Sequence, residues 1–325
     1  DLLHQNVSRL STQSYGIAVN GNILLQQELV HIGDTDTKIR FPDVDTFSVE
    51  TAGSERLRIT SSGQLLLGTS TARTPQQITT QLQIEGTTNH TSSMSMTRNQ
   101  DNIHGPDFIF NKSRGASVGS NVIVQNNDSL GNITWVGNDG TDSDSKAARI
   151  QGAVDGTPGS DDMPGRITFW TTPDGSTTLA ERLRIDKDGY VTKPNLPYFY
   201  ATRDPNITSN YLHSFVSVHG NNGSHYNNTT GRFTAPVSGF YWFSCGIWCN
   251  SASSNTSVLI QLQRYNAAAG SSTSFAGANH RTQYNSLNCS GGTYMAANDY
   301  VWIQQTGVSI QSSTPRNFFC GYLVG

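Results

Sequence analysis

The stretch that decides the fold is Gly239-Phe240-Tyr241-Trp242-Phe243-Ser244-Cys245-Gly246-Ile247-Trp248-Cys249. Aromatic and β-branched residues favour strands, in which successive side chains point to opposite faces. One face then carries Tyr241, Phe243, Cys245, Ile247 and Cys249, and the other carries Phe240, Trp242 and Trp248. A strand of a two-sheet protein normally buries one face and wets the other. Because both faces are apolar here, we expect the second to be covered by another subunit, with a loop of the same chain as the alternative.

The surrounding segment, 194–325, has the pattern of a complete all-β domain. Eight strands are predicted, at 197–202, 211–218, 239–249, 257–264, 272–282, 288–296, 299–306 and 317–324. This number of strands, separated by turns, predicts a jelly roll or a related sandwich. We expect its core or its contacts between subunits to use Phe240, Tyr241, Trp242, Phe243, Trp248, Phe318, Phe319 and Tyr322.

The first 193 residues are more polar, and one phrase occurs in them twice. Glu-Arg-Leu-Arg-Ile stands at 55–59 and again at 181–185, and a Gly follows each copy at a turn. Short strands separated by turn residues predict a β-meander over 1–75 and a β knob over 76–193. The meander strands are too sparse to close a core in one chain, so we expect copies to intertwine as a β-hairpin stalk. The charged residues of the phrase predict cross-strand ion pairs between chains, or alternatively a basic receptor patch.

Composition excludes several classes of function. The 325 residues have a net charge of −3, which gives no basic surface for nucleic acid or an anionic membrane. The sequence contains no apolar stretch of about 18 residues, the length that would predict a membrane-spanning helix. It also does not begin with a signal-peptide pattern. Because the chain starts at Asp1 rather than Met, we expect a further attachment segment upstream of it.

The four cysteines, Cys245, Cys249, Cys289 and Cys320, all lie in the last third of the chain. Cys245 and Cys249 share one predicted strand, where four residues span about 13 Å. That separation exceeds the limit of about 7 Å between the Cα atoms of a disulfide. We therefore expect buried free thiols, with cross-strand disulfides as the alternative. Free thiols fit assembly in a reducing cytoplasm.

The sequence contains no recognisable catalytic motif: no nucleophile elbow, zinc-protease helix, phosphate loop or dinucleotide fingerprint. His219 and His225 flank a Gly/Asn loop, and Asp139, Asp142 and Asp144 lie in a Gly/Ser loop, so a metal is the alternative to a plain loop at each. Asp161 and Asp162 are adjacent and would point apart on a strand, which disfavours a paired-carboxylate glycosidase. We therefore expect no enzyme, no cofactor and no metal.

Two resemblances to known families now emerge. Arg232-Phe233-Thr234-Ala235-Pro236-Val237-Ser238-Gly239-Phe240-Tyr241-Trp242-Phe243-Ser244 resembles the signature of the complement C1q globular head, with supporting matches at 225–228, at 298–301 and in the final strand. The family commonly has Gly-Asp where this chain has Asn298-Asp299. The resemblance covers about 196–325 and implies a tumour-necrosis-factor-like jelly roll packed as a homotrimer.

The first 193 residues resemble tail fibres of bacterial viruses, especially those of marine and cyanobacterial phages. The resemblance rests on segments 31–42, 50–59, 110–115, 148–150 and 169–175. It implies an elongated trimeric stalk and knob, a place in the virion tail after assembly in the host cytoplasm, and an adaptor protein bound upstream of Asp1.

Together the two resemblances imply the distal part of a tail fibre that binds a receptor on the host cell surface. In the jelly-roll family both chain ends lie at the base, so we expect the receptor at apex loops 250–256, 284–287 and 308–316. The candidate residues are Asn250, Ser251, Ser253, Asn255, Tyr284, Asn285, Gln311, Ser312 and Arg316. Their hydroxyl and amide groups suit a glycan such as lipopolysaccharide. The alternatives are a fibre-borne polysaccharide depolymerase and a head that serves only to trimerise the fibre.

Overall fold

The computed structural model describes residues 2–4, 7–13, 16–19, 22–203, 215–250, 257–281, 284–306, 309–310 and 316–325. Within these ranges the regular structure is β-strand, apart from one short 3-10 helix at Pro75–Gln77. The all-β class expected from the sequence is therefore confirmed. No helix in the same ranges has the length and hydropathy needed to cross a membrane.

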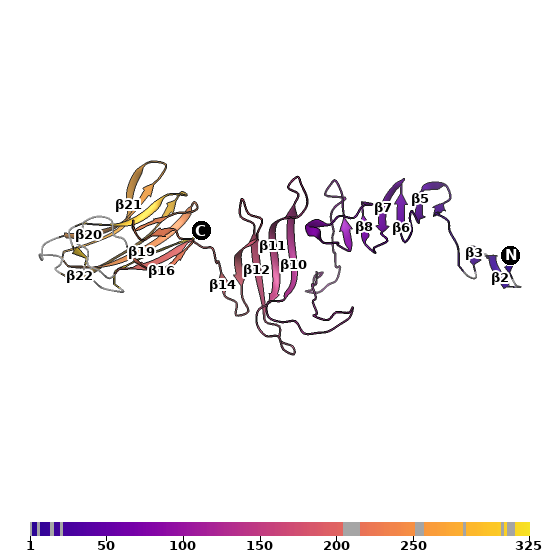
Figure 1. The fold of residues 1–325 in the computed structure, drawn as a ribbon, viewed down its shortest axis with the longest axis horizontal. Helices are drawn as coiled ribbons and strands as arrows, with labels where there is room; N and C mark the ends of the chain where they lie inside the picture. The colour runs from indigo at the N-terminus through magenta and orange to yellow at the C-terminus, as the bar shows by residue number, and fades with distance from the viewer. Residues whose placement is uncertain are drawn as a thin grey trace. The chain divides into compact units, whose positions relative to one another are not determined.

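The chain separates into two compact units, Asp1–Ala180 and Glu181–Gly325 (Figure 1). The second unit contains the whole C-terminal β domain together with the second copy of the repeated phrase. The division into segments 1–75, 76–193 and 194–325 stays a prediction.

The N-terminal part of the first unit is a meander of short strands. A three-stranded sheet comes first: β1 (Leu2–His4), β2 (Val7–Gln13) and β3 (Gly16–Val19). We call the next, six-stranded sheet the stalk sheet: β4 (Glu28–His31), β5 (Asp34–Arg40), β6 (Phe47–Thr51), β7 (Ser54–Ile59), β8 (Leu65–Leu67) and β9 (Leu82–Ile84). Its strands pair in chain order, antiparallel except for β8 with β9.

This pairing bears on the intertwined stalk expected from the sequence. Gly33 and Gly53 have φ of 85° and 68°, a conformation open to glycine, and they close two of the hairpins locally. Each strand of the stalk sheet therefore pairs with a strand of its own chain. The intertwining of several copies expected from the sequence stays a prediction.

The repeated phrase forms the same ion pair at both of its positions. Arg58 donates two hydrogen bonds to Glu55, with N–O distances of 2.6 and 2.7 Å. Arg184 donates two to Glu181, both of 2.9 Å. Each of these pairs lies inside the phrase of one chain, and pairing of its charges between chains stays a prediction. A guanidinium and a carboxylate match as two parallel hydrogen bonds, and that geometry is satisfied three residues apart on these strands.

The same turn also follows each copy of the phrase. Gly63 and Gly189 have φ of 81° and 82°, and each N–H bonds to the carbonyl three residues earlier. The turn folds β7 back onto β8, and it folds β13 (Ala180–Ile185) back onto β14 (Val191–Thr192). The phrase is thus a strand-turn-strand motif that the chain uses twice.

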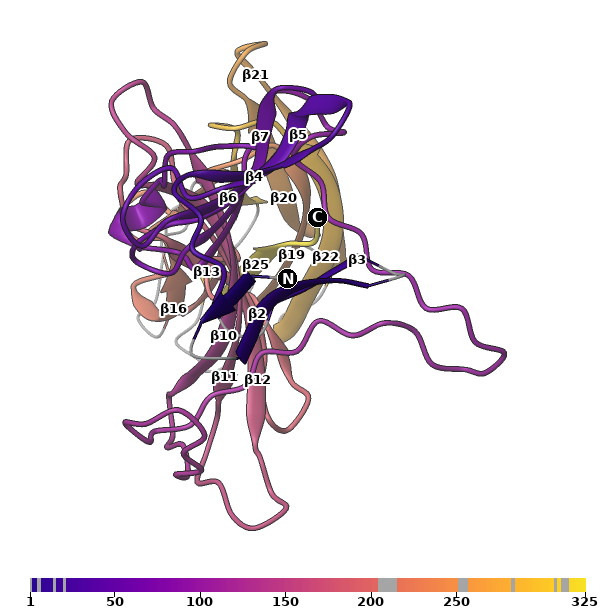
Figure 2. The same cartoon turned by 90° about the vertical axis from the view of Figure 1, so that its right-hand side faces the viewer.

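A meander of longer strands ends the first unit: β10 (Ser129–Gly137), β11 (Ser145–Val154) and β12 (Gly165–Thr171). Figure 2 shows the connection from β9 to β10 running largely outside the sheets. We predicted strands at 108–110 and 122–124 within this connection, and both are irregular. Val124 is buried and the Phe110 ring lies against Gly131 of β10, while the other apolar side chains of the two segments are exposed.

The C-terminal domain of the second unit consists of two antiparallel sheets. The first, which we call the inner sheet, has the order β16 (Ser217–Asn222), β15 (Tyr198–Thr202), β25 (Phe318–Leu323), β19 (Gly239–Asn250) and β22 (Tyr284–Met295), and β24 (Ser309–Ile310) also pairs with β19. The outer sheet has the order β17 (Tyr226–Asn227), β18 (Arg232–Thr234), β23 (Tyr300–Thr306), β20 (Ser257–Asn266) and β21 (Ser271–Arg281). The jelly-roll architecture predicted for this segment is confirmed.

The core of this domain lies between the two sheets. Tyr241, Phe243, Cys245 and Ile247 of β19 are fully buried, as the alternation in the sequence predicts. They meet Phe199, Phe233 and Phe319 from three other strands in one aromatic cluster. Each such ring contributes about 1.5–3 kcal/mol by leaving water. Gly321 allows this packing, because a methyl group there would collide with the ring of Phe243.

Candidate functional site

The inner sheet exposes an aromatic face on the side away from the core. Tyr198 of β15 stands opposite Tyr322 of β25, and Tyr322 stands opposite Trp242 of β19. Adjacent strands lie about 4.8 Å apart, so these three rings form one row across the sheet. Their exposed fractions are 46%, 46% and 40%. A row of large half-exposed aromatic rings is the kind of surface that mediates association of proteins.

A second row extends this surface. Phe240 of β19 stands opposite Tyr294 of β22, and the two are 43% and 61% exposed. The Phe240 ring lies over Gly292, where a side chain would collide with it. We call the five rings of Tyr198, Phe240, Trp242, Tyr294 and Tyr322 the aromatic face.

The predicted packing residues therefore divide between core and surface. Tyr241, Phe243 and Phe319 are fully buried in the core. Phe240, Trp242 and Tyr322 belong to the aromatic face, while Phe318 and Trp248 are half-buried. We missed Tyr198 and Tyr294 in the sequence, although each is an outward aromatic residue in an alternating strand and that alternation is the signal that identifies them.

The apex candidates gather at one end of the inner sheet. Asn250 ends β19, where it pairs with Tyr284 of β22 and with Ser309 of β24. The chain ends lie at the other end of β19, because the Phe240 N–H donates to the Gly325 carbonyl. Ser251, Ser253, Asn255, Gln311 and Ser312 lie outside the described residues, as do the side chains of Asn250, Tyr284 and Asn285.

One part of the apex prediction is wrong. Tyr284 and Asn285 do not form a loop, since they begin β22 and pair with Asn250 and Cys249. The sequence 284–287 is polar, which favoured a loop, but the long apolar strand β19 provides it with a complete backbone ladder. A ladder satisfies the N–H and C=O groups of a polar segment as well as those of an apolar one.

Arg316 is the apex candidate whose side-chain contacts are described. Its guanidinium lies 4.3 Å from the centre of the Trp248 ring. The next residue, Asn317, accepts a hydrogen bond of 2.7 Å from the Trp248 N–H. A guanidinium over an indole face is held by a cation–π attraction. Arg316 thus presents an ordered positive charge and a flat ring edge at the apical end of the inner sheet.

The stalk sheet in the first unit has a second open apolar surface. One cross-strand row runs through all six strands: Leu29, Ile39, Val49, Leu57, Leu67 and Ile84. A second row on the same face contains Phe47, Ile59, Leu65 and Leu82. We call these ten side chains the stalk face. Leu29, Ile59 and Leu82 are 56%, 41% and 51% exposed, so this face is open to water in a single chain.

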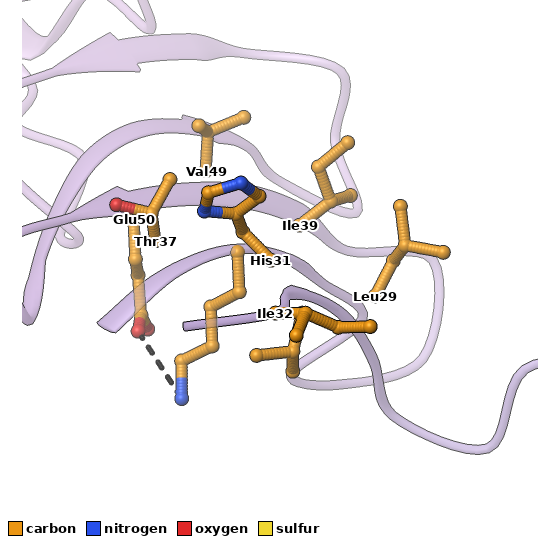
Figure 3. Close-up of a pocket in the computed structure, with 9 residues that line it drawn as sticks. Leu29, His31, Ile32, Thr37, Ile39, Val49 and Glu50 are labelled. Carbon is orange, nitrogen blue, oxygen red and sulfur yellow. Dashed lines mark ion pairs between the residues drawn. The ribbon is translucent and has the colours of Figure 1, made fainter. Parts of the chain in front are cut away.

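A hollow of about 480 Å³ opens at the N-terminal end of the stalk face. Figure 3 shows Leu29, Ile39 and Val49 around it, with Ile32 and His31 beside them. Glu50 and Lys38 also line the hollow and form an ion pair with each other at 3.6 Å (Figure 3). The hollow is apolar and open, which favours filling by hydrocarbon side chains over binding of a polar small molecule.

The opposite face of the stalk sheet is charged and largely covered. Glu50 is 8% exposed and accepts a hydrogen bond of 2.6 Å from Arg40, which holds the pKa of the Glu50 carboxyl below its usual value. Ser48 and Leu66 on this face are fully buried. The stalk sheet is thus inverted relative to an ordinary globular sheet, with ion pairs on its covered side and aliphatic side chains in water.

The polar clusters weighed as metal sites have local partners. Asp139 accepts hydrogen bonds from the N–H groups of Thr141 and Asp142. These bonds lower the pKa of the Asp139 carboxyl, and the bond from Thr141 contributes most. His219 bonds to Thr202 at 2.7 Å, and burial lowers the pKa of His225. In the part of the chain that the structure describes, no three His, Cys, Asp or Glu side chains are arranged to hold a metal ion.

Comparison with known proteins bears on the C-terminal domain. Residues 198–324 match the sequence profile of the C1q domain. The C-terminal domain is thus similar to the C1q domain, over a match that spans less than half of the chain.

Two solved structures can be set beside this match. The globular domain of zebrafish complement 1qA protein is 20% identical over 40% of this chain and 98% of its own, with a TM-score of 0.29. The Eiger TNF structure from S. frugiperda is 10% identical over 40% of this chain and 94% of its own, with a TM-score of 0.35. No curated protein sequence matches the chain.

Proposed function

We propose that the chain is the distal part of a homotrimeric viral tail fibre, whose C-terminal head binds a glycan on the surface of a bacterial host. The observation that carries the proposal is that each unit of one chain leaves an apolar sheet face in water: the stalk face in the first unit and the aromatic face in the second. Burying both faces against further copies of the chain removes both from water at once.

Three-fold assembly is the arrangement that best agrees with the head. C1q/TNF-like domains commonly form homotrimers, and the aromatic face lies on the inner sheet, with no charged side chain among its five rings. Identical uncharged faces can approach one another about a closed axis without like-charge repulsion. The stalk face is equally free of charged residues.

The apex supports binding rather than catalysis. The end of the inner sheet that carries Arg316 lies opposite the end where the chain enters and leaves the domain. A guanidinium suits the phosphates and carboxylates of bacterial surface polysaccharides, and three weak sites on one trimer give strong avidity. The proposal includes assembly in the host cytoplasm and attachment to the virion through an upstream adaptor.

Two measurements test the proposal on the full chain. The first is the mass in solution by light scattering, which we expect to equal three chains, and which should fall to one chain when Trp242→Lys and Leu57→Lys disrupt both apolar faces. The second is binding of the protein to immobilised lipopolysaccharides from a panel of Gram-negative bacteria. Arg316→Ala should weaken binding, and Tyr190→Ala, at a 68% exposed residue between β13 and β14, should not.

Each other outcome contradicts part of the proposal. A monomeric wild-type protein would remove the trimer. A trimer that binds no member of the panel and no whole cells would leave the head as an assembly clamp. Shortening of the polysaccharide during incubation would indicate a depolymerase in place of a simple receptor-binding protein.

A further inference from the structure

Two thiols meet in the core of the C-terminal domain. Cys245 of β19 and Cys289 of β22 are directly opposite one another in the antiparallel ladder, and their Sγ atoms are 3.3 Å apart. Directly opposed residues of such a pair have Cα atoms about 4.5–5.5 Å apart, which is inside the range that a disulfide spans. Both side chains are buried, at 0% and 8% exposure, and both thiols are free in the structure.

We propose that Cys245 and Cys289 are a latent cross-strand disulfide that closes when the protein meets a small-molecule disulfide oxidant. The bond would join β19 to β22, which is the edge strand of the inner sheet. The two cysteines are 44 positions apart in the sequence, and the loop that the bond closes contains β20 and β21, so one covalent link would tie the outer sheet to the inner sheet as well. This inference does not depend on the receptor or on the number of subunits.

The two sulfurs have different roles in the reaction. The contact between the thiols lowers the pKa of Cys289 and, with burial, raises the pKa of Cys245. Cys289, which is also the more exposed of the two, therefore supplies the first thiolate. That thiolate attacks one sulfur of the small disulfide and expels one small thiol, which leaves a mixed disulfide on Cys289.

The second step completes the exchange. Cys245 loses its proton, and its sulfur attacks the Cys289 sulfur and expels the second small thiol. The protein loses two protons and two electrons, and the small disulfide gains them as two thiols. The two Sγ atoms, already 3.3 Å apart on paired strands, need to approach by only about 1 Å to form the bond.

The third thiol that the structure describes is poorly placed to compete. Cys320 of β25 stands opposite Ser244 and not opposite Cys245, so the alternation of strand side chains puts it on the open face of the sheet. Its thiol points to the Ser244 carbonyl, at 3.5 Å. The side chain of Cys249 lies outside the described residues, so the experiment below includes a variant at that position.

The test uses the full chain purified in reductant. The protein is exposed to oxidised glutathione in two arms, once folded and once during refolding from denaturant, because the buried pair is reached slowly in the folded state. Intact mass, alkylation of free thiols and non-reducing peptide mapping then locate any bond. We expect a mass loss of two hydrogen atoms, a peptide that links Cys245 to Cys289, and an upward shift of the thermal midpoint that reductant reverses.

Matched variants separate this bond from adventitious oxidation. Cys289→Ala and Cys245→Ala should lose both the mass change and the thermal shift, while Cys320→Ala and Cys249→Ala should retain both. The proposal is overturned if Cys245 and Cys289 are both alkylated after refolding with the oxidant. A bond from either one to Cys249 or Cys320, or a glutathione adduct that persists on Cys289, overturns it equally.

Discussion

Tyr226 shows how a single buried hydroxyl holds two segments of the C-terminal domain together. Its ring stacks on Phe199 with centroids 4.5 Å apart, and its Oη accepts a hydrogen bond of 2.9 Å from the Phe215 N–H. The hydroxyl also donates to the Phe215 carbonyl, at 3.3 Å. Burial raises the pKa of Tyr226 from 10.0 to about 12. The side chain therefore keeps its proton at pH values where an unfolded tyrosine is ionised.

This shift predicts a loss of stability in alkali. Between about pH 10 and pH 12 the unfolded state binds fewer protons at this residue than the folded state, so the free energy of unfolding falls as pH rises. Denaturation of the wild-type protein and of Tyr226→Phe at several pH values isolates the contribution. The variant should be less stable at neutral pH by about 1–3 kcal/mol, because the Phe215 N–H loses its acceptor, and it should lose less stability between pH 10 and 12. Parallel pH profiles for the two proteins would contradict the assignment.

At the scale of the element, the repeated strand-turn-strand motif shows what short sequence signals determine. Glu-Arg-Leu-Arg-Ile followed by a Gly turn predicts a hairpin, and both copies form one. The sequence did not reveal the ion pair inside each copy, because a pattern of alternating charges fits several registers. The partner of each charge depends on the three-dimensional position of its side chain, which residue types alone do not determine.

The turn glycines of this motif yield a direct test. At Gly63, with φ of 81°, a β-branched side chain is strained, so Gly63→Val should destabilise the stalk sheet by about 1–2 kcal/mol. Gly63→Asn should cost clearly less, since asparagine tolerates this conformation. Among the described residues, none beyond the two chain neighbours comes within 4 Å of a Cβ atom placed here, so collisions with other side chains do not confuse the comparison. Urea denaturation of the two variants measures the difference, and equal losses would show that backbone strain is not the cause.

At the scale of the whole molecule, the sequence predicted the β architecture better than it predicted which side chains gather on one surface. The alternating faces of β19 were evident, because aromatic residues at every second position have one structural explanation. The stalk face was not, since its six-residue row takes one side chain from each of six strands and only the strand pairing brings them together. Of the segments expected to form apex loops, 284–287 belongs to strand β22, and the receptor site at the apex stays a prediction.

The two apolar faces should contribute separately to assembly. Leu57→Lys places a charge in the middle of the stalk face, and we expect hydrogen exchange to increase in β4–β9 while the C-terminal domain stays protected. Ser54→Lys, at an exposed position of the same strand, is the matched control and should leave exchange unchanged. If Leu57→Lys exchanges like the wild-type protein, the stalk face is not covered in the assembly. The double variant with Trp242→Lys should behave as a single chain.

The placement of both ends of the C-terminal domain on one side has a practical consequence. Tyr198, near the entry of the chain, lies opposite Tyr322, three residues before the end. A fluorescent tag fused after Gly325 would therefore emerge beside the entry point and leave the Arg316 end uncovered. The same geometry would allow the domain to be exchanged as a unit. Another fold with adjacent ends could replace it without changing the path of the preceding chain, so we expect recombination to exchange heads readily.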